Sequence, residues 1–242
     1  MVMDKQKRKE IIKSLDGLRF TDISDGLDYL GMQDLCLIDP SVEPLWRDMT
    51  SFRHRIYGFA FTVRFLPADK VVHGGSYEDY AAEIAAWRKR LWGSGWSRES
   101  GEDDIIVAEM PASRDPGVFG SENMQRWVNR GVRGLVTNAG CRDTDEVILQ
   151  QIPVYSTTRS RGIVPGRVIF EAVNVKVNIA DTLVRPGDVI VADGDGVIAM
   201  PVEIAEKAIA IARQINDRDR SDRRKNYEAA GMELDFSNID IK

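Results

Sequence analysis

Apolar residues recur along this chain with two different spacings, which predict helices alternating with strands. Spacings of three and four residues predict helices over residues 4–15, 21–31, 76–92, 123–131, 143–150 and 201–227. Alternating or short continuous apolar runs rich in β-formers predict strands over 57–66, 104–108, 134–138, 153–156, 168–177, 189–192 and 197–200. This order predicts a single α/β domain over residues 1–242, with a mixed sheet and a long C-terminal helix.

Cap and turn residues set several of the expected boundaries. Thr21 is expected to cap the second helix and Gly31 to end it. Residues 93–97, Gly-Ser-Gly-Trp-Ser, are typical of a flexible connector. The last helix is almost fully charged over 217–225, and the tail after Gly231 is expected to be loosely ordered unless a partner holds it.

Composition and charge exclude several classes of protein. The formal net charge is −5, so the chain lacks the broad positive field of a nucleic-acid binder. No stretch approaches the roughly 20 apolar residues of a membrane span, and no apolar run of signal length follows the basic N-terminus. We therefore expect a cytoplasmic protein that binds neither nucleic acid nor membrane.

Cysteines and histidines are few, and this limits the metal that the chain could hold. Cys36 and Cys141 lie too far apart in sequence for a CxxC motif, and each is expected to be a small buried residue. His54 and His73 are too few for a His-rich cluster. Any metal would be held mainly by oxygen ligands, which indicates Mg²⁺ or Mn²⁺ rather than zinc.

The segment from Gly117 to Asp143 carries the residues best suited to chemistry. Two loops, Gly117–Asn123 and Gly140–Asp143, each run into a predicted helix, so glycines and helix N-termini would present backbone amides to an anion. Arg142 adds a planar fork for a carboxylate and Asp143 a hard oxygen for a metal. Together they would clamp the carboxylate and keto oxygen of a 2-oxo acid. The alternative is that Asp143 is only a helix cap and Arg142 only a surface charge.

The same segment resembles the 4-hydroxy-4-methyl-2-oxoglutarate aldolase family, which includes the RraA regulators of ribonuclease E activity. The similarity covers about residues 18–220 and follows a long ordered set of matches. These are Gly120, Gly131-Val-Arg-Gly134-Leu-Val136, Arg142-Asp143, the element Thr21 to Gly31, Gly58 to Val63, Pro153-Val154, Pro186 to Asp193, Asp195-Gly-Val197 and Pro201. The resemblance implies a swivelling β/β/α-type (RraA-like) fold, assembled as a homotrimer or homohexamer with active sites between subunits.

The resemblance also implies roles for single residues. Arg142 would bind the pyruvyl carboxylate and Asp143 the Mg²⁺ or Mn²⁺ ion. The loop Gly120, Ser121, Glu122, Asn123 would line the substrate, with Glu122 as a further catalytic group. A carboxylate from the late helix of a neighbouring subunit would face the metal; spacing favours Asp219, then Asp217.

The implied function is a divalent-metal-dependent lyase, an aldolase or decarboxylase acting on 4-hydroxy-4-methyl-2-oxoglutarate or oxaloacetate. Two positions depart from the family pattern: Ser121 replaces an acidic residue, and Asn138-Ala139 replaces Asp-Gly. Both changes lower the negative charge expected near the metal. The alternatives are a non-catalytic protein-binding regulator of a ribonuclease, or a related lyase or hydratase for a sugar-derived acid.

Residues 73–100 look like an insertion relative to compact members of that family. The stretch carries five aromatic residues, namely Tyr77, Tyr80, Trp87, Trp92 and Trp96. One interpretation is an extra helix packed on the surface or at an interface. The other is a lid or pocket wall that changes substrate choice.

Overall fold

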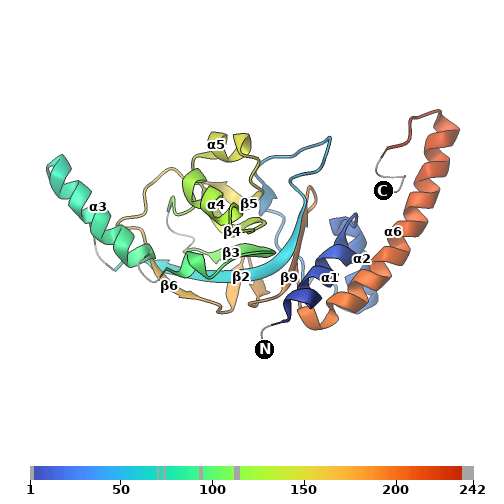
Figure 1. The fold of residues 1–242 in the computed structure, drawn as a ribbon, viewed down its shortest axis with the longest axis horizontal. Helices are drawn as coiled ribbons and strands as arrows, with labels where there is room; N and C mark the ends of the chain where they lie inside the picture. Colours follow the sequence, from blue (N-terminus) through green and yellow to red (C-terminus); the bar gives the residue numbers. More distant parts are fainter. Residues whose placement is uncertain (1–2, 70, 73–74, 93–94, 112–114, 236–242) are drawn as a thin grey trace.

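The computed structural model describes residues 3–235, apart from 70, 73–74, 93–94 and 112–114 (Figure 1). The helices are α1 (Lys5–Leu15), α2 (Phe20–Tyr29), α3 (Tyr77–Trp92), α4 (Ser121–Val128), α5 (Thr144–Leu149) and α6 (Val202–Ala230), with a 3-10 turn at Trp96–Arg98. The strands are β1 (Glu43–Pro44), β2 (Ile56–Pro67), β3 (Asp104–Glu109), β4 (Gly134–Cys141), β5 (Val154–Arg159), β6 (Val168–Val173), β7 (Val177–Ile179), β8 (Thr182–Val184), β9 (Val189–Asp193) and β10 (Gly196–Met200).

One large mixed sheet organises the molecule, as the alternating pattern predicts. Its strand order is β1-β5-β4-β3-β2-β9-β10, and β6 also pairs with the far end of β2. Strands β2 to β5 run parallel, whereas β1, β6, β9 and β10 pair antiparallel with their neighbours. The carboxyl ends of the parallel strands therefore lie at the same end of the sheet, and α/β sheets bind ligands beyond that end.

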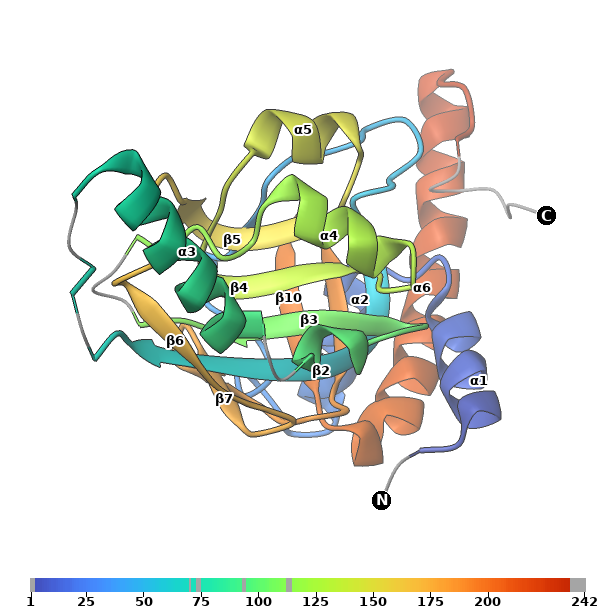
Figure 2. The same cartoon turned by 60° about the vertical axis from the view of Figure 1, so that its left-hand side comes forward.

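Helices and a small hairpin cover the sheet and bury both of its faces. In Figure 2, α4 and α5 lie over one face, where Met124, Trp127 and Val147 join the buried side chains of β2 to β5. The β7–β8 hairpin packs against the opposite face. Helices α1, α2 and α6 form a separate apolar cluster against β9 and β10. Burial on both faces explains the near-continuous apolar runs of the central strands.

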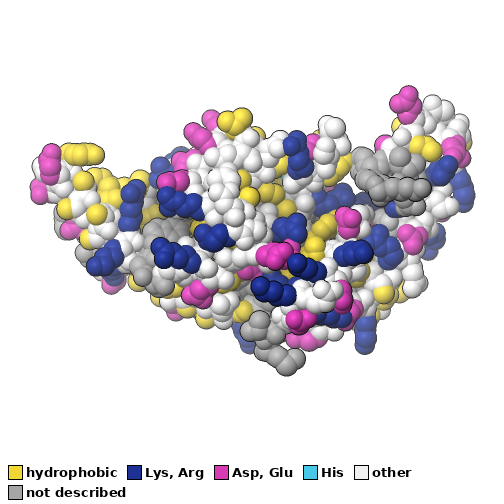
Figure 3. Space-filling view, in the orientation of Figure 1, with side chains coloured by type: hydrophobic (Ala, Val, Ile, Leu, Met, Phe, Trp, Pro, Cys, Tyr) yellow, Lys and Arg dark blue, Asp and Glu magenta, His cyan; other side chains and the backbone are white. Residues whose placement is uncertain are grey.

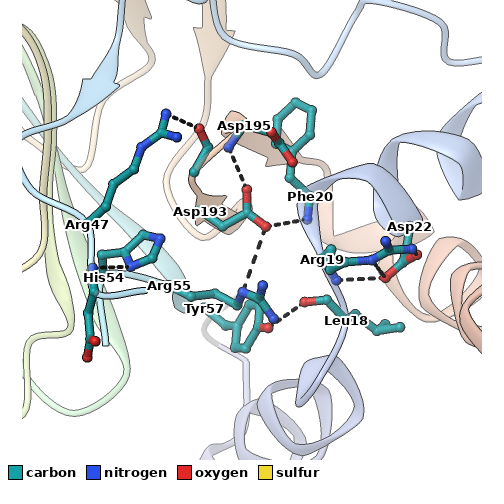
Figure 4. Close-up of polar contacts among 12 residues, drawn as sticks. Leu18, Arg19, Phe20, Asp22, Arg47, His54, Arg55, Tyr57, Asp193 and Asp195 are labelled. Carbon is teal, nitrogen blue, oxygen red and sulfur yellow. Dashed lines mark hydrogen bonds and ion pairs between the residues drawn. The ribbon is translucent and has the colours of Figure 1, made fainter. Parts of the chain in front are cut away.

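A buried polar network joins α2 to the β9–β10 turn (Figure 4). Asp193, only 3% exposed, accepts hydrogen bonds from the amides of Phe20 and Asp195 at 2.9 Å each. Its carboxylate thus satisfies an orphan amide in the first turn of α2. Helix α2 begins at Phe20, so the predicted cap at Thr21 is wrong. Asp193 of β9 binds the Phe20 amide, and Asp22 of the helix itself accepts from the Arg19 amide at 2.8 Å.

The region between β6 and β9 differs from the prediction. The expected strand 168–177 breaks after Val173, and Asn174 takes a left-handed conformation (φ 54°). The chain then enters the β7–β8 hairpin, whose second strand the pattern does not predict. Apolar and polar residues continue to alternate past Asn174, so the sequence pattern predicts one uninterrupted strand.

The expected connector at 93–97 is wrong at its aromatic residue. Trp96 is fully buried and stacks on Phe170 with ring centroids 5.9 Å apart and planes 3° from parallel. Residues 93–94 of that run, His73, and the tail from residue 236 lie outside the described residues. In the described part of the chain, no helix is long and apolar enough to cross a membrane.

Candidate active site

A small cavity of about 280 Å³ opens beside the first turn of α4. Its lining residues come from four segments of the chain: Ile84, Trp87 and Arg88 of α3; Gly117, Val118, Gly120, Glu122 and Asn123 at the start of α4; Arg142 and Asp143 after β4; and Ile163, Val164 and Pro165 before β6. The volume is at the lower end of the roughly 300–1,000 Å³ typical of ligand pockets, so it suits a small metabolite.

The turn after β4 holds Arg142 and Asp143 with their side chains together. The amide of Arg142 donates to the carbonyl of Phe119 at 2.9 Å, which ties this turn to the loop before α4. Asp143 has left-handed backbone (φ 56°), and its side chain does not cap α5. Instead its Oδ1 accepts from Arg142 Nε at 3.2 Å and its Oδ2 from the Ser121 amide at 3.3 Å. The helix-cap alternative for Asp143 is therefore wrong for its side chain.

Two glycines allow this close approach. A Cβ at Gly120 would lie 2.5 Å from Asp143 Oδ2, and one at Gly117 would lie 2.3 Å from the Gly162 carbonyl and 2.6 Å from Arg142 Cδ. Contacts below 3.0 Å force a neighbour to move. Glycine at these positions is thus a requirement of the Arg142–Asp143 geometry.

The predicted loop Gly120–Asn123 is the first turn of α4, because the helix begins at Ser121 rather than at Asn123. The first amides of an α-helix have no acceptor within the helix, so they can bind an anion; the Ser121 amide already binds Asp143, which leaves those of Glu122 and Asn123. Glu122 and Asn123 line the cavity. The side chain of Glu122 is 79% exposed and pairs with Arg126 one turn later.

Asn138 lies outside the cavity. Its Oδ1 accepts from the Met110 amide at 2.8 Å, and its Nδ2 donates to the Met110 carbonyl at 3.0 Å. An aspartate has no donor for the second bond, so this asparagine joins the ends of β3 and β4. It borders a separate depression with Thr157 and Arg159, and the cavity lined by Asp143 does not include it.

Helix α3 forms one wall of the cavity, as one of the two interpretations of residues 73–100 expects, but the sequence did not single out Ile84 or Arg88 as site residues. Ile84 and Arg88 are four residues apart and so share one face of the helix. Trp87 is 2% exposed and donates from Nε1 to the Val168 carbonyl of β6 at 3.1 Å, which fixes α3 against the sheet. The apolar spacing in 76–92 predicts the helix, but it cannot indicate which face meets Arg142.

Comparison with known proteins agrees with the fold. A model of the RraA-like family, described as aldolase/RraA, matches residues 20–199. The chain belongs to the RraA-like family. The crystal structure of RraAS2 from Streptomyces coelicolor, described as an unusual member of the RNase ES inhibitor RraA protein family, has 21% sequence identity. The match covers 92% of this chain and 98% of that one, with a TM-score of 0.70, so the two share a fold.

Curated relatives of this RraA-like chain match it at low identity. Protein DlpA of Legionella pneumophila is 25% identical over 234 residues, which are 95% of this chain and 33% of DlpA. A protein of Arabidopsis thaliana, provisionally named 4-hydroxy-4-methyl-2-oxoglutarate aldolase 3, is 29% identical over 113 residues, or 43% of this chain and 63% of its own length. The chain thus spans about a third of DlpA and under two thirds of the aldolase-named relative.

The donor set of the RraA-like site fits a loosely held divalent ion. Across the described residues, no three His, Cys, Asp or Glu side chains come together to hold a metal. Asp143 supplies one carboxylate, 37% exposed, with one hydrogen bond on each oxygen. Mg²⁺ is commonly bound through one or two carboxylates plus water and substrate oxygens. The site therefore matches an ion completed by substrate rather than an all-protein cage.

Other predicted residues lie elsewhere in the chain. Asp219 on α6 is 3.6 Å from Arg19 and does not line the cavity of its own subunit; its predicted role concerns a neighbouring subunit and stays a prediction. Cys36 and Cys141 are buried, as predicted. Burial raises the pKa of Cys141 to about 11, so its thiol stays protonated at neutral pH and is no nucleophile.

Proposed function

We propose that this protein is a divalent-metal-dependent lyase that releases pyruvate from a 2-oxo acid such as 4-hydroxy-4-methyl-2-oxoglutarate or oxaloacetate. One observation carries the proposal: Arg142 and Asp143 face a small cavity at the N-terminus of α4 with binding capacity unused. The pair uses only Nε of Arg142, so both terminal amino groups can bind a carboxylate.

The chain's own groups would bind and orient the substrate. Arg142 and the amides of Glu122 and Asn123 would hold the C1 carboxylate, and Asp143 would anchor the Mg²⁺ or Mn²⁺ ion. In aldol cleavage the C3–C4 bond breaks, its electron pair moves onto C3 and the C2 oxygen, and the C4 hydroxyl loses its proton. A proton from water then adds to C3 and gives pyruvate. When bound, the divalent ion supplies Lewis-acid stabilisation of the charge that develops on the keto oxygen. Glu122, the other carboxylate lining the cavity, takes up the proton directly or through water.

The same proposal includes a homo-oligomer, a trimer or hexamer, in which Asp219 of a neighbouring subunit approaches the site. Light scattering coupled to size-exclusion chromatography measures the mass. A monomeric protein that is fully active would exclude any role for a neighbour's carboxylate.

The test is pyruvate release, followed with a coupled dehydrogenase. Purified protein receives Mg²⁺ or Mn²⁺ with each substrate, and parallel reactions contain a chelator or the Arg142→Ala variant. Release that needs both metal and Arg142 is expected. The variant controls for spontaneous metal-catalysed decarboxylation of oxaloacetate. Absence of release above that background would reject the lyase and favour the regulator alternative.

A further inference from the structure

Helix α3 places a second arginine, Arg88, at the cavity, and the proposed function gives it no role. Arg88 is exposed and lines the same cavity as Arg142. Among the described residues, no carboxylate lies within ion-pair distance of it. Its neighbours on α3 differ: Arg90 pairs with Asp69 at 3.3 Å and lies over the Trp87 ring.

The other charges of the cavity are already compensated. Asp143 pairs with Arg142, and Glu122 pairs with Arg126, which lies outside the cavity. Arg88 is thus the uncompensated charge of the described lining. In Figure 3, dark-blue lysine and arginine side chains gather between α3 and α4. An anion bound there would meet positive charge on a surface whose net charge elsewhere is negative.

The position of Arg88 is fixed by packing. Trp87, buried and hydrogen-bonded to β6, anchors the helix one residue before it. Ile84 lines the cavity one turn earlier on the same face, so the α3 wall is apolar at Ile84 and cationic at Arg88. Arg142 lies on a different wall, in the turn after β4. A ligand whose C1 carboxylate is on Arg142 therefore has a second cation available to its other end.

We infer that Arg88 is a specificity-determining residue that binds the distal anionic group of the substrate, so that the site prefers dicarboxylic over monocarboxylic 2-oxo acids. This inference rests on the proposed lyase function. Arginine suits the role because its planar fork binds a carboxylate with two parallel hydrogen bonds.

The experiment compares two substrates that differ only at the distal end. 4-Hydroxy-4-methyl-2-oxoglutarate carries a distal carboxylate, and 4-hydroxy-2-oxopentanoate carries none; both yield pyruvate by the same C3–C4 cleavage. Arg88→Gln is expected to lower kcat/KM about 10- to 100-fold for the first and less than about 2-fold for the second. Arg88→Lys should recover part of the loss. Lys89→Gln, an equal charge change on α3 outside the cavity, should leave both values unchanged.

A binding measurement separates failure of this inference from failure of the lyase function. Calorimetry with Mn²⁺ compares 2-oxoglutarate with 2-oxopentanoate, a matched pair that needs no turnover. Weaker binding of 2-oxoglutarate alone in Arg88→Gln supports the role of Arg88 even if the wild-type protein releases no pyruvate. Equal losses for both ligands, or none for either, would overturn it while leaving the lyase proposal to its own assay.

Discussion

Two arginine–aspartate pairs in this molecule have similar chemistry and opposite surroundings. Asp22 is 1% exposed and accepts from the backbone and guanidinium of Arg19 (Figure 4). It also accepts from Asn216 Nδ2 at 2.8 Å. Asp143 is 37% exposed, with one hydrogen bond on each oxygen. The first pair is saturated and joins α2 to α6, whereas the second retains capacity for a ligand. Saturation thus distinguishes a structural ion pair from a binding one.

The largest expected effect is a loss of activity when the Arg142–Asp143 pair is changed. Asp143→Asn removes the carboxylate proposed to anchor the metal, so metal-dependent kcat/KM should fall about 1,000-fold, or ~4 kcal/mol of transition-state stabilisation. Steady-state assays over a range of Mg²⁺ concentrations measure the loss. Asp145→Asn, a carboxylate of the same turn that does not line the cavity, serves as the control. Retention of full metal-dependent turnover in Asp143→Asn would show that the metal assignment is wrong.

A change in the saturated pair Arg19–Asp22 should instead lower the free energy of unfolding. Asp22→Ala leaves Arg19 and Asn216 without their shared acceptor, and we expect a loss of about 2–4 kcal/mol after allowing for the 29% exposure of Arg19. For a chain of this size that corresponds to a Tm lowered by roughly 4–16 °C. Calorimetry tests this against Asp28→Ala on the exposed face of α2. Equal Tm values for the two variants would contradict a structural role for the pair.

Arg142→Ala should act mainly on substrate binding. Removing the carboxylate fork is expected to raise KM about 10- to 100-fold with a smaller change in kcat, because a charge-assisted hydrogen bond contributes about 1.5–3 kcal/mol. The matched control is Arg161→Ala, an 88% exposed arginine near the site that pairs with Asp115. A change confined to kcat would mean that Arg142 acts on the reacting atoms and not on the carboxylate.

Glu122 provides a test within the cavity, because its proposed proton transfer is needed for only one of the two reactions. Glu122→Gln should lower kcat about 10-fold for the aldol substrate and leave oxaloacetate decarboxylation unchanged, since loss of CO₂ needs no base. Arg126→Ala should change kcat by less than about 3-fold, because exposed ion pairs contribute about 0–1 kcal/mol. Equal effects of Glu122→Gln on the two substrates would rule out the proton-transfer role.

The smallest expected effect concerns pH. Burial alone would raise the pKa of Asp22, but hydrogen bonds from Arg19 and Asn216 outweigh it and hold the pKa below its ordinary value. A lowered pKa in the folded state contributes stability above the unfolded pKa of about 3.9, and that stability is lost as pH falls through the folded value. Denaturant titrations between pH 5 and 2.5 should therefore show a shallower loss of stability on acidification in Asp22→Ala than in the wild-type protein. If the stability of Asp22→Ala and of the wild-type protein fell in parallel with pH, the lowered pKa of Asp22 would be contradicted.

Sequence patterns alone were enough to predict the helices, the strands of the main sheet apart from β1, the RraA-like family and the Arg142–Asp143 motif. Each of these depends on local spacing: period-two and period-3.6 apolar patterns, glycines before helices, and adjacent charged residues. The strand ends at 168–177 and the cap of α2 were wrong because a single left-handed residue and a carboxylate 173 positions away decide them.

Only the tertiary structure decided which charged groups are free to bind. Both Arg19–Asp22 and Arg142–Asp143 are short-range arginine–aspartate pairs in the sequence. Asp22 differs because it is buried and also binds Asn216, which comes from a helix at the other end of the chain. The same holds for Arg88, whose place beside Arg142 depends on how Trp87 anchors α3 to β6. Burial and hydrogen-bond saturation depend on contacts between distant segments, and local sequence patterns do not specify those contacts.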